Sequence, residues 1–251
     1  MFQQERMDRI MQILRKYHYV TVDYLVEEIR YSPASIRRDI ALLAKQGLVT
    51  RSYGGVSIND NNESPFRFRQ HSMKIAKNHI AEQAAALVED NSIVFIDGST
   101  SAQYMGHFLV NKKGITVVTN NMTLASYLRE NGINTYCTGG FVNEIPGILV
   151  GDITNDAFSR FHADIMFFST VAFDKGYIYE NDENYYSHHK IMIKNSDKRV
   201  FLCGSDKISK KHKLIVCNLE SIDYFISDVD IDDEIKSAYE NTEFICSEKS
   251  K

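Results

Sequence analysis

The segment from Asp97 to Ser101 carries residue types that bind phosphate groups. It follows a short apolar run, Ser92–Ile96, whose length and β-branched residues are typical of a buried parallel strand. Its glycine lets a ligand approach the backbone, while three hydroxyls and the N–H groups of a following helix start can donate hydrogen bonds to an anion. In most proteins such residues form only a turn and a helix cap, so a site needs further polar groups beside them.

Two more polar turns follow the next two predicted strands. Asn120 comes after the apolar run Ile115–Thr119, the pair Gly139-Gly140 comes after the strand beyond it, and Lys207 follows a later strand. The carboxyl ends of parallel strands meet at one edge of a sheet, so these turns should lie together where α/β proteins bind ligands. The coincidence favours a ligand site. The residues expected to bind this ligand are Asp97, Gly98, Ser99, Thr100, Ser101, Asn120, Gly139, Gly140 and Lys207.

A different chemistry is indicated near the N-terminus by a helix from Ser32 to Gly47. Ser32 is a favourable N-cap, Pro33 at the first helical position loses no useful N–H group, and Gly47 allows the left-handed conformation that ends a helix. These signals at both ends predict one short helix with well-defined boundaries.

The two faces of this helix differ in character. Ile36, Ile40 and Leu43 recur at the spacing of an apolar stripe. The opposite face combines cations with alanines, so the helix backbone can approach an anion closely. A lone Arg-Arg pair is more often a solvated surface, but the neighbouring elements favour a nucleic-acid contact. The residues of this face are Ala34, Arg37, Arg38, Ala41 and Lys45.

The flanking segments predict a winged helix-turn-helix. Two helices are expected over Gln3–Lys16 and Val22–Ile29, and a tight turn joins the second to the helix at Ser32. In this arrangement the last helix lies in the major groove. The segment Leu48–Ile58 reads as a hairpin, or wing, with Gly54-Gly55 at or near its bend. The residues expected to bind DNA are Ser32, Ala34, Ser35, Arg37, Arg38, Lys45 and Arg51, the last of these on a phosphate.

The N-terminal part of the chain resembles the DeoR family of bacterial transcription regulators. The resemblance rests on Ser-Pro-Ala-Ser-Ile-Arg-Arg-Asp-Ile, on Leu-Leu-Ala-Lys-Gln-Gly-Leu-Val and on Arg-Ser-Tyr-Gly-Gly-Val, which together span about fifty residues. Tyr31, Ser35 and Tyr53 stand where the family has Val, Thr and His. The resemblance implies that the chain binds operator DNA.

The resemblance continues through the rest of the chain. The family's sensor domain carries Asp-x-Gly-Thr-Thr, Thr-Asn-Ser, Gly-Gly, an Asp near a strand start and a late Lys, and Asp164 and Lys207 occupy the last two places. It implies a fold similar to ribose-phosphate isomerases and CoA transferases, with a phosphorylated sugar as effector. Gly204 and Tyr185 stand where the family often has carboxylates, unless Asp206 and Glu183 are their shifted equivalents. The resemblance therefore implies a retained phosphate end and a changed sugar end.

Charge is distributed unevenly along the 251 residues. The formal net charge is −4, yet residues 1–57 hold 9 Lys and Arg against 6 Asp and Glu, and the remainder is acidic. A net charge of +3 on the predicted DNA-binding part indicates weak binding by one copy, because phosphate neutralisation dominates affinity. We therefore expect a homo-oligomer, a dimer or tetramer, on paired half-sites.

Other features exclude several classes of protein. No apolar run reaches the roughly 20 residues of a membrane span, and no apolar signal region is present, so we expect a cytoplasmic protein. The four cysteines are widely spaced and are expected to be mostly buried free thiols. His188 and His189 are adjacent, so on a helix they point about 100° apart and are not expected to hold a metal. No cofactor is expected.

The expected fold class is α/β, with a winged helix-turn-helix domain over residues 1–58, a linker over 59–71 and an α/β effector-sensing domain over 72–251. A helix over Ser72–Val88 should turn Ile75 inward, and the run Lys213–Val216 should join a largely parallel sheet. The expected function is a DNA-binding regulator, a repressor of sugar-metabolism genes controlled by a phosphorylated sugar, without enzymatic activity.

Two alternatives stay open from the sequence. One is a phosphosugar isomerase or deaminase with an appended helix-turn-helix, which would need a carboxylate or lysine base beside the phosphate site. Gly204 and Tyr185 stand where such carboxylates would help, which disfavours catalysis. The other is an altered pocket that binds a nucleotide or no ligand.

Overall fold

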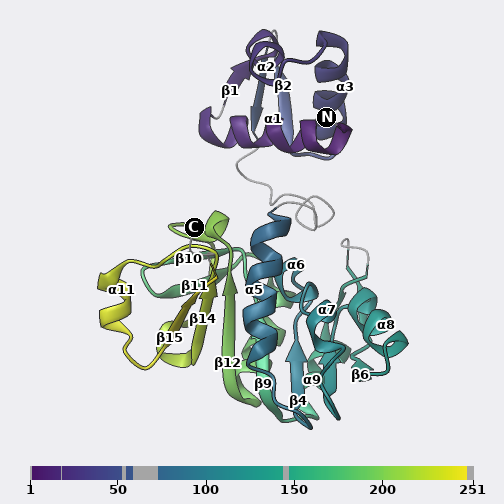
Figure 1. Ribbon diagram of the computed structural model, residues 1–251, viewed down its shortest axis with the longest axis vertical. Coiled ribbons are helices and arrows are strands. Elements are labelled where there is room, and N and C mark those ends of the chain that lie inside the picture. The colour runs from purple at the N-terminus through teal and green to yellow at the C-terminus, as the bar shows by residue number, and fades with distance from the viewer. Residues whose placement is uncertain (1, 18, 53–54, 59–72, 144–146, 248–251) are drawn as a thin grey trace. The chain divides into compact units, whose positions relative to one another are not determined.

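The chain forms two compact units, Met1–Ser72 and Met73–Lys251, each described by itself (Figure 1). The computed structural model describes residues 2–17, 19–52, 55–58, 73–143 and 147–247. The expected linker over 59–71 and Gly54 at the predicted bend lie outside these residues. No helix in the described ranges is long and apolar enough to cross a membrane.

The first unit packs three helices against a small antiparallel sheet with strand order β1-β3-β2. Its apolar core takes residues from every helix, including Leu14, Leu25, Ile36 and Leu43, all fully buried. The hairpin β2–β3 is the predicted wing, with Gly55 paired to Ser52 inside the ladder. The elements are α1 (Gln3–Tyr17), β1 (Tyr19–Thr21), α2 (Val22–Ile29), α3 (Pro33–Lys45), β2 (Val49–Ser52) and β3 (Gly55–Ile58).

The boundaries of α3 are those that its sequence predicts. The hydroxyl oxygen of Ser32 accepts a hydrogen bond from the backbone N–H of Ser35 at 3.3 Å, as an N-cap does. Gly47 has φ +73°, the left-handed conformation that follows the helix end. Strand β1 was not expected, because three residues are too few for a periodic pattern.

A buried ion pair ties α3 to α1. The carboxylate of Asp39 is fully buried, and Arg6 Nε donates to its Oδ2 at 2.8 Å while Gln3 Nε2 donates to its Oδ1 at 3.0 Å. The hydrogen bond to Asp39 raises the pKa of Arg6 above its usual value. The Arg6 guanidinium carbon lies 4.4 Å from the centre of the Tyr31 ring. The negative charge on α3 is therefore neutralised from within the unit.

The second unit is built on a seven-stranded sheet in which every neighbouring pair is parallel, with the order β15-β14-β12-β9-β4-β5-β6. This confirms the expected fold class of a winged helix-turn-helix joined to an α/β domain. The strands are β4 (Ile93–Ile96), β5 (Thr116–Thr119), β6 (Asn134–Cys137), β9 (Ala163–Phe168), β12 (Ser196–Cys203), β14 (Tyr224–Ser227) and β15 (Glu243–Cys246).

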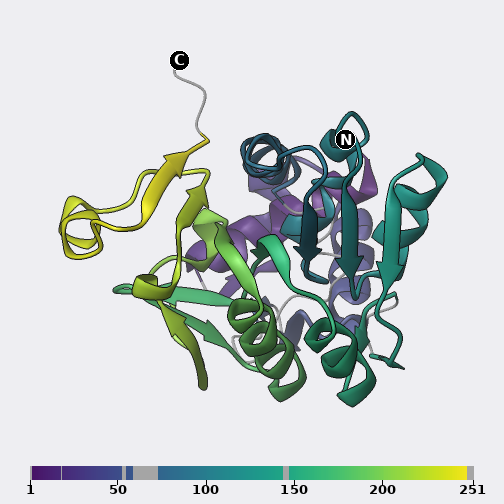
Figure 2. The same ribbon diagram turned by 90° about the horizontal axis from the view of Figure 1, so that it is seen from below.

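Helices cover both faces of this sheet, because its strands turn alternate apolar residues to opposite sides. Val94 and Ile96 pack with α5–α8, while Phe95 packs with α9 and α10. Figure 2 shows α5 on one side of the strands and α9 and α10 on the other. The helices are α5 (Lys74–Ala86), α6 (Thr100–Gln103), α7 (Gly106–Leu109), α8 (Met122–Glu130), α9 (Asp152–Ser159), α10 (Glu183–Lys194) and α11 (Asp233–Ala238).

Three expectations about the second unit are wrong in detail. Strand β13 (Leu214–Asn218) lies outside the parallel sheet and pairs antiparallel with β11 (Tyr177–Glu180), which also pairs with β10 (Ala172–Asp174). Ile75 is 75% exposed, because α5 turns other residues inward. All four cysteines are free, but Cys137 and Cys246 are exposed. Apolar composition alone does not reveal which sheet a strand joins.

Candidate functional site

The exposed face of α3 is the one that the sequence predicts. Ile36, Ile40 and Leu43 are buried in the core of the unit. Ser32 donates from its hydroxyl to that of Ser35 at 2.9 Å, and Ser35 is half-buried. The side of α3 that faces solvent carries two small and three cationic residues and suits a phosphate backbone. These exposed residues are Ala34, Arg37, Arg38, Ala41 and Lys45.

The wing adds one more cation to the same unit. Arg51 is exposed on β2, the strand that directly follows α3 and pairs with β3. All seven residues expected to bind DNA therefore lie on α3, on its N-cap or on the wing. A helix that presents cations above an apolar core, with a hairpin after it, is the geometry of a winged helix-turn-helix.

The loops expected to bind a ligand meet at the carboxyl edge of the parallel sheet. Strands β4, β5 and β6 are immediate neighbours, so the loops that follow them lie side by side. A side chain at Gly98 would bring its Cβ within 2.7 Å of Ile148 Cγ2 and 3.3 Å of Asn120 Oδ1. At Gly140, φ is +125° and a Cβ would lie 2.7 Å from the Val150 carbonyl oxygen. Both close approaches require glycine.

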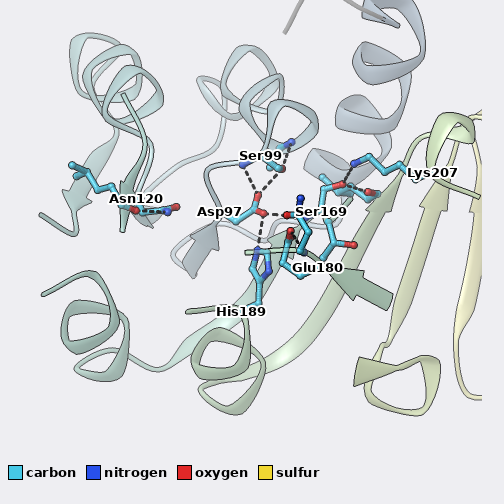
Figure 3. Close-up of polar contacts among 12 residues, drawn as sticks. Asp97, Ser99, Asn120, Ser169, Glu180, His189 and Lys207 are labelled. Carbon is cyan, nitrogen blue, oxygen red and sulfur yellow. Dashed lines mark hydrogen bonds and ion pairs between the residues drawn. The ribbon is translucent and has the colours of Figure 1, made fainter. Parts of the chain in front are cut away.

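Asp97 organises the first of these loops instead of facing solvent. It is 1% exposed, and its Oδ1 accepts from the N–H and the hydroxyl of Ser99 at 3.1 and 2.6 Å. Its Oδ2 accepts from the N–H of Ser169 at 3.1 Å and lies 3.0 Å from His189 Nε2. Figure 3 shows Asp97 between Ser99, Ser169 and His189. The carboxylate therefore fixes the loop after β4 against the loop after β9 and against α10.

The hydroxyl groups of the same loop differ in whether they already make hydrogen bonds within the chain. Ser99 caps α6, since its hydroxyl oxygen accepts from Ala102 N–H at 3.2 Å. Thr100 and Ser101 are 4% and 1% exposed, and the Ser101 hydroxyl has no hydrogen-bond partner among the described residues.

Lys207 reaches this edge from β12. It ends a 3-10 turn, Ser205–Lys207, and its Nζ donates to the Ser169 hydroxyl at 2.5 Å. The Ser169 hydroxyl in turn donates to the Leu202 carbonyl. Lys207 is thus linked to Asp97 through Ser169, as the labelled residues of Figure 3 show. The ammonium is a positive charge beside the loops after β4 and β9.

Gly139 and Gly140 follow β6 and are tied to α9. The Thr154 hydroxyl donates to the Gly139 carbonyl at 2.8 Å, and both glycines are half-buried. Asp164 lies elsewhere, because its Oδ2 accepts from Ile93 N–H at 2.7 Å where β4 and β9 begin. It supports the opposite edge of the sheet.

His188 and His189 on α10 lie close to the Asp97 loop, whereas from the sequence they were assessed only as a possible pair of metal ligands. Both are fully buried, with ring centres 4.7 Å apart. Burial, together with His189, lowers the pKa of His188 well below 6.5. In the described chain no group of three His, Cys, Asp or Glu side chains could hold a metal ion. Two adjacent histidines can be noticed in the sequence, but nothing in the sequence indicates that His189 contacts Asp97.

Several buried polar atoms at this edge have no hydrogen-bond partner in the part of the chain that the structure describes. Most buried polar atoms in proteins are paired, so each exception asks for an explanation. Asn120 Nδ2 donates to the Leu149 carbonyl at 2.8 Å, which leaves its oxygen open. The unpaired atoms are Ser101 Oγ, Asn120 Oδ1, both ring nitrogens of His188 and His189 Nδ1.

A separate cavity of about 400 Å³ is lined in part by Ser205 and Ile208, which lie on either side of Lys207 in the chain. It is lined by residues that include Phe173, Asp174, Ser205 and Asp230. None of the residues expected to bind a ligand lines it. The polar loops and the cavity are therefore different places.

Two family models match the chain. Residues 6–62 match the DeoR-like helix-turn-helix domain, and residues 73–229 match the DeoR C terminal sensor domain. The second match alone spans more than half of the chain.

Curated relatives align along most of both sequences. The glycerol-3-phosphate regulon repressor of Escherichia coli (strain K12) is 26% identical over 91% of this chain and 92% of its own length. The L-fucose operon activator of Haemophilus influenzae is 28% identical over 92% and 94%. The lactose phosphotransferase system repressor of Staphylococcus aureus (strain N315) is 26% identical over 93% and 95%. Among solved structures, ribose 5 phosphate isomerase A from Neisseria gonorrhoeae has a TM-score of 0.40, with 15% identity over 53% of each chain.

Proposed function

Because the chain belongs to the DeoR family of transcription regulators, we propose that it represses sugar-metabolism genes and that a phosphorylated sugar controls its binding to DNA. The observation that carries the proposal is the exposed cationic face of α3, set on a helix whose other face is fully buried. The family favours a regulator over the isomerase or deaminase considered from the sequence.

In this proposal Arg37 and Arg38 contact DNA from α3, with Ser35 near base edges and Arg51 on a phosphate. Ser32, Ala34 and Lys45 complete the surface. The modest excess of positive charge in residues 1–57 supports a dimer or tetramer on paired half-sites in the cytoplasm, because each copy neutralises few phosphates.

The effector is proposed to bind at the carboxyl edge of the parallel sheet. Lys207 and the N–H groups at the start of α6 are donors that suit a phosphate. The glycines after β4 and β6 let these loops pack closely against Ile148 and Val150 of the same chain, which holds the loops in place at this edge. The effector shifts DNA binding only if it binds the DNA-bound and free states with different affinity.

The test begins with selection of binding sites from random duplex DNA by the full chain. Fluorescence anisotropy on the selected site, at two salt concentrations and with a panel of sugar phosphates, then measures affinity and response. Arg38→Ala should weaken binding by about fivefold or more, with an unchanged thermal midpoint. Arg129→Ala, which removes an exposed arginine from α8, is the matched control and should bind normally.

The effector side is tested with Lys207→Ala and Thr100→Ala. Each should remove the response to the sugar phosphate while DNA is still bound. Loss of DNA binding in both variants would mean that these loops are structural. No sequence-specific binding by the unaltered protein would overturn the regulator and favour the enzyme.

A further inference from the structure

We propose that His189 recognises a hydroxyl group of the effector through its Nδ1, so that the effector is a phosphate ester with a free hydroxyl held below the phosphate loop. This assignment rests on the proposed function and deepens it. In this assignment His189 makes the protein bind one phosphorylated sugar more tightly than another, and more tightly than inorganic phosphate.

The hydrogen bond to Asp97 fixes which nitrogen of His189 carries a proton. An ionised carboxylate only accepts hydrogen bonds, so His189 Nε2, 3.0 Å from Asp97 Oδ2, must be the donor. Asp97 has three further donors, from Ser99 and Ser169, and is itself 1% exposed. We take the ring with its proton on Nε2 alone as part of this proposal, so that Nδ1 carries a lone pair; no described residue is its hydrogen-bond partner.

A second buried acceptor lies at the same edge. The Asn120 side chain is oriented by its Nδ2, which donates to the Leu149 carbonyl, so its Oδ1 is left without a donor. Asn120 follows β5 and Asp97 follows β4, and these two strands are neighbours. Both residues are fully or almost fully buried. Figure 3 shows Asn120 and His189 approaching this edge from different elements.

The excess of acceptors decides which chemical group is missing. A buried acceptor that is left unpaired costs about 1–3 kcal/mol. The oxygens of a fully deprotonated phosphate group are acceptors as well, so that form cannot donate to His189 Nδ1 or Asn120 Oδ1. A hydroxyl can donate to either atom. Lys207 is a donor at this edge and suits the phosphate, whereas the open acceptors suit the hydroxyls of the remaining carbon chain.

His188 extends the same surface. Its ring is buried against Phe158 and Tyr185, and its lowered pKa keeps it neutral, with one donor and one acceptor nitrogen. Neither nitrogen has a partner within the described residues. A neutral imidazole pairs with a hydroxyl in either direction. We assign the selective contact to His189, because only its tautomer is fixed by a carboxylate.

The experiment uses isothermal titration calorimetry on the full chain. Inorganic phosphate, glycerol 3-phosphate, ribose 5-phosphate, fructose 1-phosphate and glucose 6-phosphate are the first probes, and every monodeoxy analogue of the tightest sugar phosphate follows. At least one monodeoxy analogue should bind about tenfold or more weakly, because it leaves a buried acceptor unpaired. The tightest sugar phosphate should also bind about tenfold or more tightly than inorganic phosphate.

His189→Gln is the informative variant, since its amide can still donate to Asp97. The sugar phosphate should bind about tenfold or more weakly to this variant, the penalty of one monodeoxy analogue should disappear, and the affinity for inorganic phosphate should change less than about twofold. His162→Gln is the matched control. His162 also pairs with an aspartate, Asp197 at 2.8 Å, but it is exposed and lies just before β9, at the opposite edge of the sheet.

If His189→Gln lost affinity for the sugar phosphate and for inorganic phosphate by the same factor, the assignment would be overturned. His189 would then only support Asp97. Equal binding of all monodeoxy analogues to the unaltered protein would overturn it without any variant, which covers the case in which His189→Gln does not fold. No binding of any probe to the unaltered protein would overturn the proposed function and this assignment with it.

Discussion

The two units of this protein treat their buried polar groups in opposite ways. In the first unit Asp39 is fully buried and is held by Arg6 and Gln3, so its charge is neutralised before any partner arrives. At the carboxyl edge of the second unit, His189 Nδ1 and Asn120 Oδ1 are buried without a donor. The difference fits the two proposals made above, in which the first unit is preorganised to bind DNA and a bound effector supplies the missing partners in the second.

The largest expected effect comes from breaking the buried ion pair between Arg6 and Asp39. Asp39→Ala leaves the Arg6 guanidinium buried without its anion, and removal of one partner from a buried pair is strongly destabilising. We expect the thermal midpoint of the first unit to fall by about 10 °C or more, and DNA binding to fall with it. Circular dichroism melting measures this. Glu27→Ala, exposed on α2, should melt normally.

The same pair offers a rescue that sharpens the comparison. Arg6→Met combined with Asp39→Leu replaces the ion pair by apolar side chains of similar volume, which is often neutral or stabilising. The double variant should recover most of the lost midpoint. If Asp39→Ala alone melted like the unaltered protein, preorganisation of α3 by this pair would be wrong.

A smaller effect is expected from pH at the open edge. His188 stays neutral in the folded protein because its pKa is lowered, whereas in the unfolded chain it takes up a proton below about pH 6.5. The unfolded state then binds more protons, so the free energy of unfolding should decrease as pH falls below 6.5, by at most about 1.4 kcal/mol per pH unit for this residue. Above that range His188 contributes no slope.

Urea unfolding between pH 5 and 8 measures that slope. It should be smaller in His188→Gln than in the unaltered protein, and unchanged in His212→Gln, which replaces an exposed histidine. An identical slope in all three proteins would show that His188 is protonated in the folded state as readily as in the unfolded chain.

The smallest effect is expected on the wing. Arg51 is exposed on β2, and a phosphate contact there adds affinity without sequence preference. Arg51→Ala should weaken DNA binding by about two- to threefold on every site and reduce the salt slope by about one. Anisotropy titrations on two different selected sites test this. A loss confined to one of the sites would place Arg51 at base edges instead.

Local features of the sequence were sufficient for the boundaries of α3 in the first unit, although not for strand β1. The cap at Ser32 and the stop at Gly47 act over three or four residues, so they can be read from neighbouring letters. The parallel direction of β4, β5 and β6 was also predictable, because strands that alternate with helices favour a parallel sheet. The family resemblance covers nearly the whole chain and supports both of these predictions.

The contacts that complete the second unit act at long range and were therefore missed. His189 meets Asp97 across 92 positions, and Ser169 meets it across 72. Strand β13 is as apolar as a strand of the main sheet, so composition did not reveal its antiparallel partner β11. Asp97 was expected to contact the effector, yet in the structure it binds four donors of its own chain. Its direct contact with an effector stays a prediction.

The long reach of Asp97 also has a consequence for the order in which the protein is made. Its donors lie as far along the chain as residue 189, and contacts of such sequence separation form late, because a long loop must close first. A ribosome that has released only the strands up to β6 has exposed the Asp97 loop without its supports. The growing chain therefore acquires its DNA-binding helix early and its sensing edge only near the end of synthesis.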